Sequence, residues 1–202
     1  MAEQNKQAAF SSGSASAAGS VGAASTGLAQ SIPDVRHWPH PNLSTWGRPP
    51  LNIVLYQPEI PANTGNISRT CVVTGAALHL IEPLGFDISE RAVRRAGLDY
   101  WQKLQLYTYR DWADFLARNP GAEIFLATTK GSVPYTEIRY PRGAFLVFGR
   151  ETAGLPEELH QAYPGRRLRI PMRSEYRSLN LSNAVAVVLF EALRQQGFPD
   201  LL

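Results

Sequence analysis

The sequence contains a single cysteine, Cys71, among its 202 residues. No internal disulfide can form and no cysteine cluster can bind zinc, which favours a reducing compartment and predicts a cytoplasmic location. Long apolar runs are also missing, because the most apolar stretch, residues 181–193, is interrupted by Ser182, Asn183 and Glu191. A membrane span needs roughly 20 consecutive apolar residues. We therefore predict a soluble protein that has no membrane partner.

Several catalytic signatures are absent as well. The sequence has no GxGxxG, no GxxxxGK(S/T), no HExxH and no GxSxG, which argues against dinucleotide enzymes, P-loop kinases, zinc proteases and serine hydrolases. The four histidines are scattered along the chain, at His37, His40, His79 and His160. We expect no metal site.

The first part of the chain differs in composition from the rest. Between Met1 and Gln30, alanine, serine and glycine supply 19 residues without apolar periodicity. Such a segment cannot offset the entropy that ordering would cost. We predict that residues 1–48 are a disordered extension and linker, and that residues 49–202 form one domain.

From Leu51 onward, short apolar runs alternate with amphipathic pieces, which predicts an α/β fold. The runs expected to be strands are 51–56, 77–82, 104–109, 123–128, 144–149 and 167–170. The pieces expected to be helices are about 64–74, 88–96, 111–118, 156–162 and 180–196. Strands that alternate with helices imply a parallel sheet covered by helices on both faces.

Ligands of such sheets bind beyond the carboxyl ends of the strands, so the loops there are candidate sites. The loop after the first strand, residues 57–63, contains two prolines, and Asn63 or Thr64 can cap the helix that follows. In that helix Ile67, Cys71 and Val72 would form the inner stripe.

Two later loops have a similar composition. In the loop after 144–149, Gly149 and Gly154 would let backbone approach a ligand. The loop after 167–170 presents hydroxyls and amides before the last helix, including Asn180. We expect the three loops to meet at one edge of the sheet.

The segments NIVLYQPEIPANTGNISRTC, FLVFGRETAGLPEEL and LRIPMRSEYRSLNLSNAVAVVLFEALRQ resemble the three motifs of the SPOUT class of S-adenosylmethionine-dependent RNA methyltransferases. Together with IEPLGF, RRAGLDYW and ATTKG, they are most similar to the small bacterial tRNA ribose 2'-O-methyltransferases that modify the wobble cytidine or uridine. The similarity runs from about Leu51 to Pro199, and residues 1–48 have no counterpart in these minimal enzymes.

The resemblance implies a fold, a cofactor and an assembly. The C-terminal segment would thread through a loop to form a deep trefoil knot, and the polar start of the last helix would be buried as a pocket for S-adenosylmethionine. The protein would act as a homodimer, with the helix from Leu181 packed against the second subunit. By analogy the cofactor-binding residues are Ala127, Thr128, Gly149, Ile170 and Ser178.

The resemblance also assigns residues to catalysis. Arg69 corresponds to the family's catalytic arginine, and supporting polar residues are Asn66, Glu151, Asn180 and Ser182. A guanidinium, with a pKa above about 12, is a poor proton acceptor. We therefore expect Arg69 to hold the substrate phosphate and to stabilise the developing 2'-alkoxide.

Contacts with tRNA are expected from an arginine-rich segment. Residues 166–177 carry five arginines and one acid, and Arg173 and Arg177 are the predicted substrate-binding residues. Arg91, Arg94 and Arg95 form a second basic group. The five-arginine segment could equally be a solvated face or a contact between subunits. Stacking of splayed bases is one use for the aromatic residues Tyr100, Trp101 and Tyr176, and core packing is the alternative for the first two.

Three functions are compatible with these residues. The favoured one is 2'-O-methylation of the wobble nucleotide of tRNA, with leucine tRNAs as the expected substrates. The alternatives are ribose methylation of ribosomal RNA and a knotted RNA-binding protein without activity. Arg69, Gly149, Glu151, Ser178 and Asn180 are all intact, which favours an enzyme because a binding protein need not keep them.

Overall fold

The computed structural model describes residues 48–89 and 99–201. Within them the strands form one sheet in the order β3-β2-β1-β6-β4-β7-β5, and every neighbouring pair is parallel. The strands are β1 (Asn52–Tyr56), β2 (Ala77–Ile81), β3 (Leu106–Tyr109), β4 (Ile124–Ala127), β5 (Val133–Pro134), β6 (Phe145–Phe148) and β7 (Arg167–Arg169). The six predicted strands are confirmed to within about two residues at each end. β5 was not predicted, because two residues carry no periodicity.

The helices confirm most of the remaining pattern. They are α1 (Pro61–Thr74), α3 (Trp112–Arg118), α4 (Glu157–Ala162) and α5 (Leu181–Gln195), with the short 3-10 helices η2 (Asp99–Lys103) and η3 (Pro164–Arg166). Of the helix predicted at 88–96, Ile88 and Ser89 are not helical and the other residues lie outside the described ranges. No helix in residues 48–89 and 99–201 is long and apolar enough to cross a membrane.

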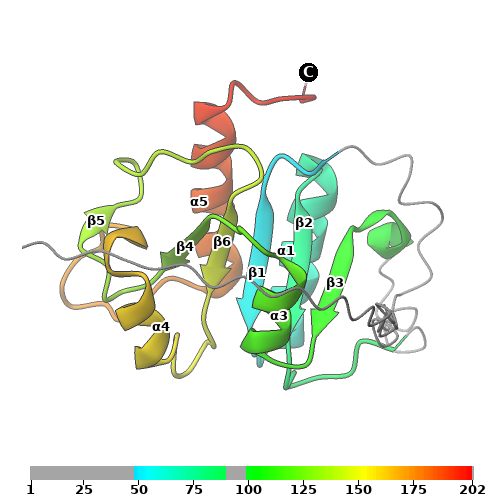
Figure 1. Cartoon of the computed structure of the whole chain (residues 1–202), viewed down its shortest axis with the longest axis horizontal. Helices are drawn as coiled ribbons and strands as arrows, with labels where there is room; N and C mark the ends of the chain where they lie inside the picture. Colours follow the sequence, from blue (N-terminus) through cyan, green and yellow to red (C-terminus); the bar gives the residue numbers. More distant parts are fainter. Residues whose placement is uncertain (1–47, 90–98, 202) are drawn as a thin grey trace, which may run out of the picture. The chain divides into compact units, whose positions relative to one another are not determined.

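The sheet is buried on both faces, as parallel sheets usually are. Side chains alternate along β1, so Ile53 and Leu55 join the core under α1 and α5, whereas Val54 joins a second core under α3 and α4. Figure 1 shows these two pairs of helices on opposite faces of the sheet. The predicted cover of helices on both faces is confirmed.

The start of α1 differs from the prediction. The helix begins at Pro61, and its N-cap residue, Ile60, makes no capping hydrogen bond through its side chain. Proline suits the first helical position because its φ is already helical. The N–H that proline lacks would have no partner within the helix at this position. Asn63 and Thr64 are therefore inside the helix and buried, and the assignment of either as the cap was wrong.

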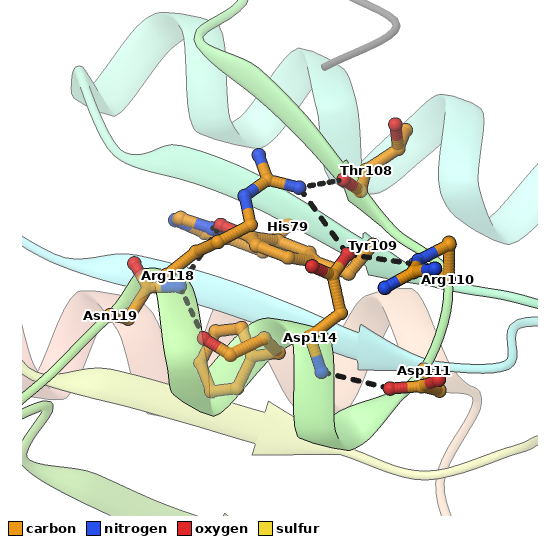
Figure 2. A network of polar contacts seen from close by, with 9 residues as sticks. His79, Thr108, Tyr109, Arg110, Asp111, Asp114, Arg118 and Asn119 are labelled. Carbon is orange, nitrogen blue, oxygen red and sulfur yellow. Dashed lines mark hydrogen bonds and ion pairs between the residues drawn. The ribbon is translucent and has the colours of Figure 1, made fainter. Parts of the chain in front are cut away.

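A directed chain of hydrogen bonds crosses three strands on the α3 side of the sheet. Figure 2 shows the residues of its second half, His79, Tyr109 and Asn119. Asn52 Nδ2 donates to the Gly143 carbonyl, at 2.8 Å, so Asn52 Oδ1 must accept from His79 Nε2, at 3.0 Å. His79 Nδ1 then accepts from the Tyr109 hydroxyl, at 2.8 Å, and the Tyr109 oxygen accepts from Asn119 Nδ2. The polar side-chain atoms of Asn52, His79 and Tyr109 all have partners, and these hydrogen bonds tie β1, β2 and β3 together.

His79 is neutral in this setting. Its ring is 3% exposed and stacks on Tyr107, with 4.8 Å between ring centroids. Burial, with a smaller effect from the charge of Arg118, lowers the pKa of His79 to about 3. The neutral ring of His79 is therefore a packed core residue with two fixed hydrogen bonds, and it does not serve as an acid or a base.

Candidate functional site

A cavity of about 740 Å³ lies at the carboxyl ends of β4, β6 and β7, and we call it the carboxyl-edge pocket. All three loops that were expected to meet contribute to its lining, so that expectation is confirmed. Its base is apolar, with Phe148, Leu168 and Leu181, while its rim carries polar residues and backbone. This combination, at a volume of roughly 300 to 1,000 Å³, is typical of sites for small molecules.

The pocket brings together most of the predicted site residues. Its lining includes all five residues predicted to bind the cofactor, which are Ala127, Thr128, Gly149, Ile170 and Ser178. It also includes three predicted catalytic or substrate-binding residues, which are Glu151, Asn180 and Arg177. Four further predicted residues lie outside the lining, and they are Asn66, Arg69, Arg173 and Ser182. The individual roles of these residues stay predictions.

One wall of the pocket is the loop Gly149–Leu155, which follows β6. Its two ends are joined by a backbone bridge between Arg150 and Gly154, in which the Gly154 amide donates to the Arg150 carbonyl at 2.9 Å. Gly154 has φ +68°, a left-handed conformation that glycine adopts without strain. A Cβ at Gly149 would overlap the backbone of Gly154 and Leu155. The backbone of Gly154 and Leu155 thus excludes a side chain at Gly149, which also lines the pocket, and the close approach of a ligand there stays a prediction.

Glu151 fastens this loop to the start of α1. Its carboxylate accepts hydrogen bonds from the backbone amides of Glu59, at 2.9 Å, and Ile60, at 3.2 Å, and from Asn63 Nδ2, at 3.0 Å. α1 has no acidic residue in its first turn, so Glu151 supplies the negative charge that a helix N-terminus favours. Both carboxylate oxygens are occupied by donors, which suits a structural role and not proton abstraction.

Asn63 links this carboxylate to the start of α5. It is 5% exposed, and its Oδ1 accepts from Asn180 Nδ2 at 2.9 Å while its own Nδ2 reaches Glu151. Asn180 caps α5, because its Oδ1 accepts from the Ser182 amide at 2.9 Å and the Ser182 hydroxyl at 2.7 Å. Glu151, Asn63, Asn180 and Ser182 thus form one network along the pocket rim.

Two expectations about this network need correction. The polar start of the last helix is not buried, since Asn180 and Asn183 are exposed and Ser182 is half-buried. It forms an open rim because the pocket faces solvent on this side. Sequence reasoning also missed Asn63, which it assigned to capping. Asn63 lies four residues before the buried Ile67, and this spacing places the two on one face of a helix and could have identified it.

Arg69 and Asn66 lie on the exposed side of α1, three residues apart. Their helix begins at the rim of the pocket, where Ile60 and Asn63 line it. Neither side chain lines the pocket itself. This position suits a contact with a large substrate that arrives from solvent.

The later part of the arginine-rich segment, residues 173–177, is also exposed. Arg173 lies 3.7 Å from Glu175, both at the surface, and Tyr176 is 65% exposed. Arg177 lines the pocket and reaches solvent. Trp101, in contrast, is 3% exposed and packs in the core, so of the two uses considered for it core packing is confirmed and base stacking is excluded. The side chain of Tyr100 lies outside the described part of the chain.

The parallel sheet and the cavity at its carboxyl edge define an α/β protein with a candidate site for a small molecule at the place where such sheets usually bind ligands. The chain belongs to the SpoU rRNA Methylase family, whose profile matches residues 50–190. Members of this family are S-adenosylmethionine-dependent RNA methyltransferases. The SPOUT resemblance inferred from the three motifs is therefore confirmed.

Individual relatives agree with this assignment. The chain is 53% identical over 151 residues to a tRNA (cytidine(34)-2'-O)-methyltransferase of Burkholderia cenocepacia, covering 73% of this chain and 97% of the relative. A structure described as giving insights into 2-OH methylation of C/U34 on tRNA matches with 45% identity and a TM-score of 0.69, over 75% of this chain and 99% of the other.

A third relative was solved with the methyl donor. It is an AdoMet-bound rRNA methyltransferase from Sinorhizobium meliloti, which is 31% identical, with a TM-score of 0.64. The match covers 74% of this chain and 57% of that longer chain. The common part is therefore the domain that holds the carboxyl-edge pocket.

Proposed function

We propose that this protein transfers a methyl group from S-adenosylmethionine to the ribose 2'-hydroxyl of nucleotide 34 of tRNA, a cytidine or a modified uridine. One observation carries the proposal. The pocket and its Glu151–Asn63–Asn180 network belong to a chain that is 53% identical to a tRNA (cytidine(34)-2'-O)-methyltransferase over 97% of that enzyme's length.

The pocket suits this methyl donor in size and chemistry. The apolar base formed by Phe148, Leu168 and Leu181 fits an adenine ring, and the rim offers the backbone of Ala127 and Ile170 to its polar edge. When bound, S-adenosylmethionine supplies a methyl group already activated by its sulfonium. No group of three or more potential metal ligands occurs among residues 48–89 and 99–201.

The chemistry then asks the protein for alignment and charge stabilisation. Arg69 would hold the phosphate of the target nucleotide and stabilise negative charge that develops on the 2'-oxygen. The proton leaves to phosphate or water, because a guanidinium rarely accepts one. Glu151 would act by positioning, since three donors already occupy its carboxylate.

The rim supports binding of an RNA strand. Arg177 lines the pocket, and Arg173 and Tyr176 are exposed on the same segment. Arginine pairs well with phosphate, and an exposed tyrosine offers a face for an unstacked base. We infer that this segment holds the anticodon loop, which leaves nucleotide 34 over the pocket.

A second copy of the chain is the expected partner. α5 buries Val185, Val188 and Leu189 in its own domain but leaves Val187 and Phe190 exposed, by 37% and 45%. A helix that is apolar on two sides usually packs on both. We infer a homodimer in which this outer face of α5 is covered.

The trefoil knot is also inferred from the family. β7 lies between β4 and β5 in the sheet, and the chain then returns to α5, which packs against α1 and β6. This return path supports a threaded C-terminus.

Methylation assays on defined RNA test the proposal. The full-length protein would be incubated with labelled S-adenosylmethionine and either unmodified tRNA or ribosomal RNA, and the methylated nucleoside located by nuclease digestion and mass spectrometry. We expect 2'-O-methylation at position 34 of tRNA. Methylation of ribosomal RNA alone would favour the ribosomal alternative. Cofactor binding without transfer to either RNA would favour a binding protein.

A further inference from the structure

The tip of the loop Gly149–Leu155 is held by a side chain from a different loop. The carboxylate of Glu59, which follows β1, accepts a hydrogen bond from the Thr152 amide at 3.0 Å. It also accepts from the Thr152 hydroxyl, with oxygen–oxygen distances of 2.9 and 2.8 Å. The residues are 93 positions apart in sequence, so this contact, which we call the Glu59–Thr152 clasp, joins two separate walls of the pocket.

The backbone bridge fixes only the base of the loop, so side-chain contacts have to hold its tip. That bridge joins Arg150 to Gly154 and leaves the three residues between them, Glu151, Thr152 and Ala153, projecting from it. All three line the carboxyl-edge pocket. Thr152 and Ala153 are exposed, so packing contributes little to their position.

A second set of hydrogen bonds joins the same two loops, with the donors and the acceptor exchanged. The Glu59 carboxylate accepts a hydrogen bond from the Thr152 amide, and the carboxylate of Glu151, next to Thr152, accepts from the amides of Glu59 and Ile60. Each loop therefore gives a carboxylate to backbone donors of the other. The Glu151 carboxylate also accepts from the Asn63 side chain. In the described ranges, the hydrogen bonds found for the Glu59 carboxylate all come from Thr152.

The backbone of Glu59 is itself fixed from behind. The Gly85 amide donates to the Pro58 carbonyl at 2.9 Å. A Cβ at Gly85 would lie 2.6 Å from the Glu59 carbonyl oxygen, so the loop after β2 fits closely against this turn. The carboxylate of Glu59 thus projects from a rigid support toward Thr152 at the loop tip.

We propose that Glu59 is a positioning residue for cofactor binding, which acts through Thr152 to hold residues 151–153 in place over the carboxyl-edge pocket. This inference rests on the proposed function, because it assigns the cofactor to that pocket. Glu59 touches no reacting atom in this scheme. Its loss lets the loop tip leave the pocket, so the cofactor binds more weakly while the methyl-transfer step, once the cofactor is bound, is unchanged.

A set of four variants tests the clasp by calorimetric titration with S-adenosylmethionine. Glu59→Ala removes all the bonds and is expected to weaken binding about 10-fold, the effect of losing charge-assisted hydrogen bonds at a solvent-exposed site. Glu59→Gln can still accept from the amide and donate to the hydroxyl, so its loss should stay within about 3-fold. Thr152→Val loses the hydroxyl and Thr152→Ser keeps it, so the first should bind more weakly and the second like wild type.

Kinetics and stability separate positioning from a general structural role. In tRNA methylation we expect a higher KM for S-adenosylmethionine in Glu59→Ala, with kcat and the KM for tRNA within about 2-fold of wild type. A merely structural contact would instead lower the melting temperature and leave the ranking of the four variants unrelated to their hydrogen bonds. Glu157→Ala is the matched control, because it removes another exposed carboxylate contact, at 3.0 Å from Lys130, outside the pocket lining.

The double variant Glu59→Ala/Thr152→Val makes the test sharper. If the two residues act as a unit, its affinity should equal that of Glu59→Ala. Wild-type affinity in Glu59→Ala, or full additivity of the two losses, would overturn the clasp. A wild-type protein that does not bind S-adenosylmethionine at all would instead overturn the proposed function.

Discussion

At the scale of single residues, the predicted site residues divide into those that line the pocket and those that do not. Glu151 and Asn180 line it and hold each other through Asn63, whereas Arg69 stands outside the lining on the exposed side of α1. Removing a residue of the second kind should therefore affect the reaction without affecting the cofactor.

Arg69→Ala provides this test. We expect the affinity for S-adenosylmethionine to stay within about 2-fold, while methyl transfer falls by a factor of about 10² to 10³, the usual effect of losing one preorganised donor. Arg69→Lys keeps the charge but not the planar fork, so it should lie closer to alanine than to wild type. Single-turnover methylation of unmodified tRNA, with binding measured in parallel, checks both. Near-normal turnover by Arg69→Ala would remove this arginine from the mechanism.

Gly149→Val tests the tight return of the loop after β6. A Cβ here overlaps backbone that cannot move aside like a flexible side chain, so the loop Gly149–Leu155 should rearrange and S-adenosylmethionine binding should fall by at least about 100-fold. Gly165→Ala is the control, because a Cβ at Gly165 meets nothing within 4 Å. Circular dichroism should show both variants folded. Unchanged affinity in folded Gly149→Val would mean that the loop is not part of the pocket.

At the scale of secondary-structure elements, the hydrogen-bond chain through His79 makes the strands β1, β2 and β3 sensitive to acid. The ordinary pKa of histidine is about 6.5, and burial lowers that of His79 to about 3. At a pH between these two pKa values, the unfolded chain therefore binds a proton at His79 that the folded chain does not bind. Stability due to this residue is complete above pH 6.5 and is lost progressively as the pH falls from there toward 3.

The expected slope is about 1.4 kcal/mol of unfolding free energy per pH unit for one such histidine. His160 is also buried, and desolvation lowers its pKa too, so it adds to the effect. Urea unfolding between pH 7 and pH 4.5 measures the slope in wild type, His79→Gln and His160→Gln. The first variant should be less stable at pH 7 but should show a shallower slope. An unchanged slope in His79→Gln would mean that His79 is protonated in the folded protein.

Sequence patterns predicted the elements better than the contacts between them. Short apolar runs located β1 and β6 because a buried parallel strand is apolar on both faces, while Val133–Pro134 is too short to show a pattern. The start of α1 was misplaced because two rules competed, and proline at the first position prevailed over a capping asparagine. The roles of Glu59 and Asn63 were missed for a further reason: the partners of their side chains lie 88 to 117 residues away. Local periodicity carries no information about such contacts.

At the scale of the whole molecule, the outer face of α5 predicts how two copies meet. Phe190→Asp places a charge on the apolar face that the homodimer would bury, so the variant should be monomeric at micromolar concentration. Leu116→Asp is a matched control, since Leu116 is exposed to a similar degree, 38%, on α3 across the sheet. Light scattering after gel filtration gives the mass of each. A dimeric Phe190→Asp protein would place the subunit contact elsewhere.

The order in which the ribosome delivers the chain gives the pocket one more property. Its lining extends from Ile60 to Ala184, and the network along its rim needs Asn180 to reach back to Asn63 across 117 residues. No nascent chain that stops short of α5 can complete the cavity, however well its early strands have paired. Contacts this distant also close slowly, because much chain entropy is lost before they form. The pocket is therefore completed only when Ala184 has been synthesised, after the strands β1 to β7 that support it.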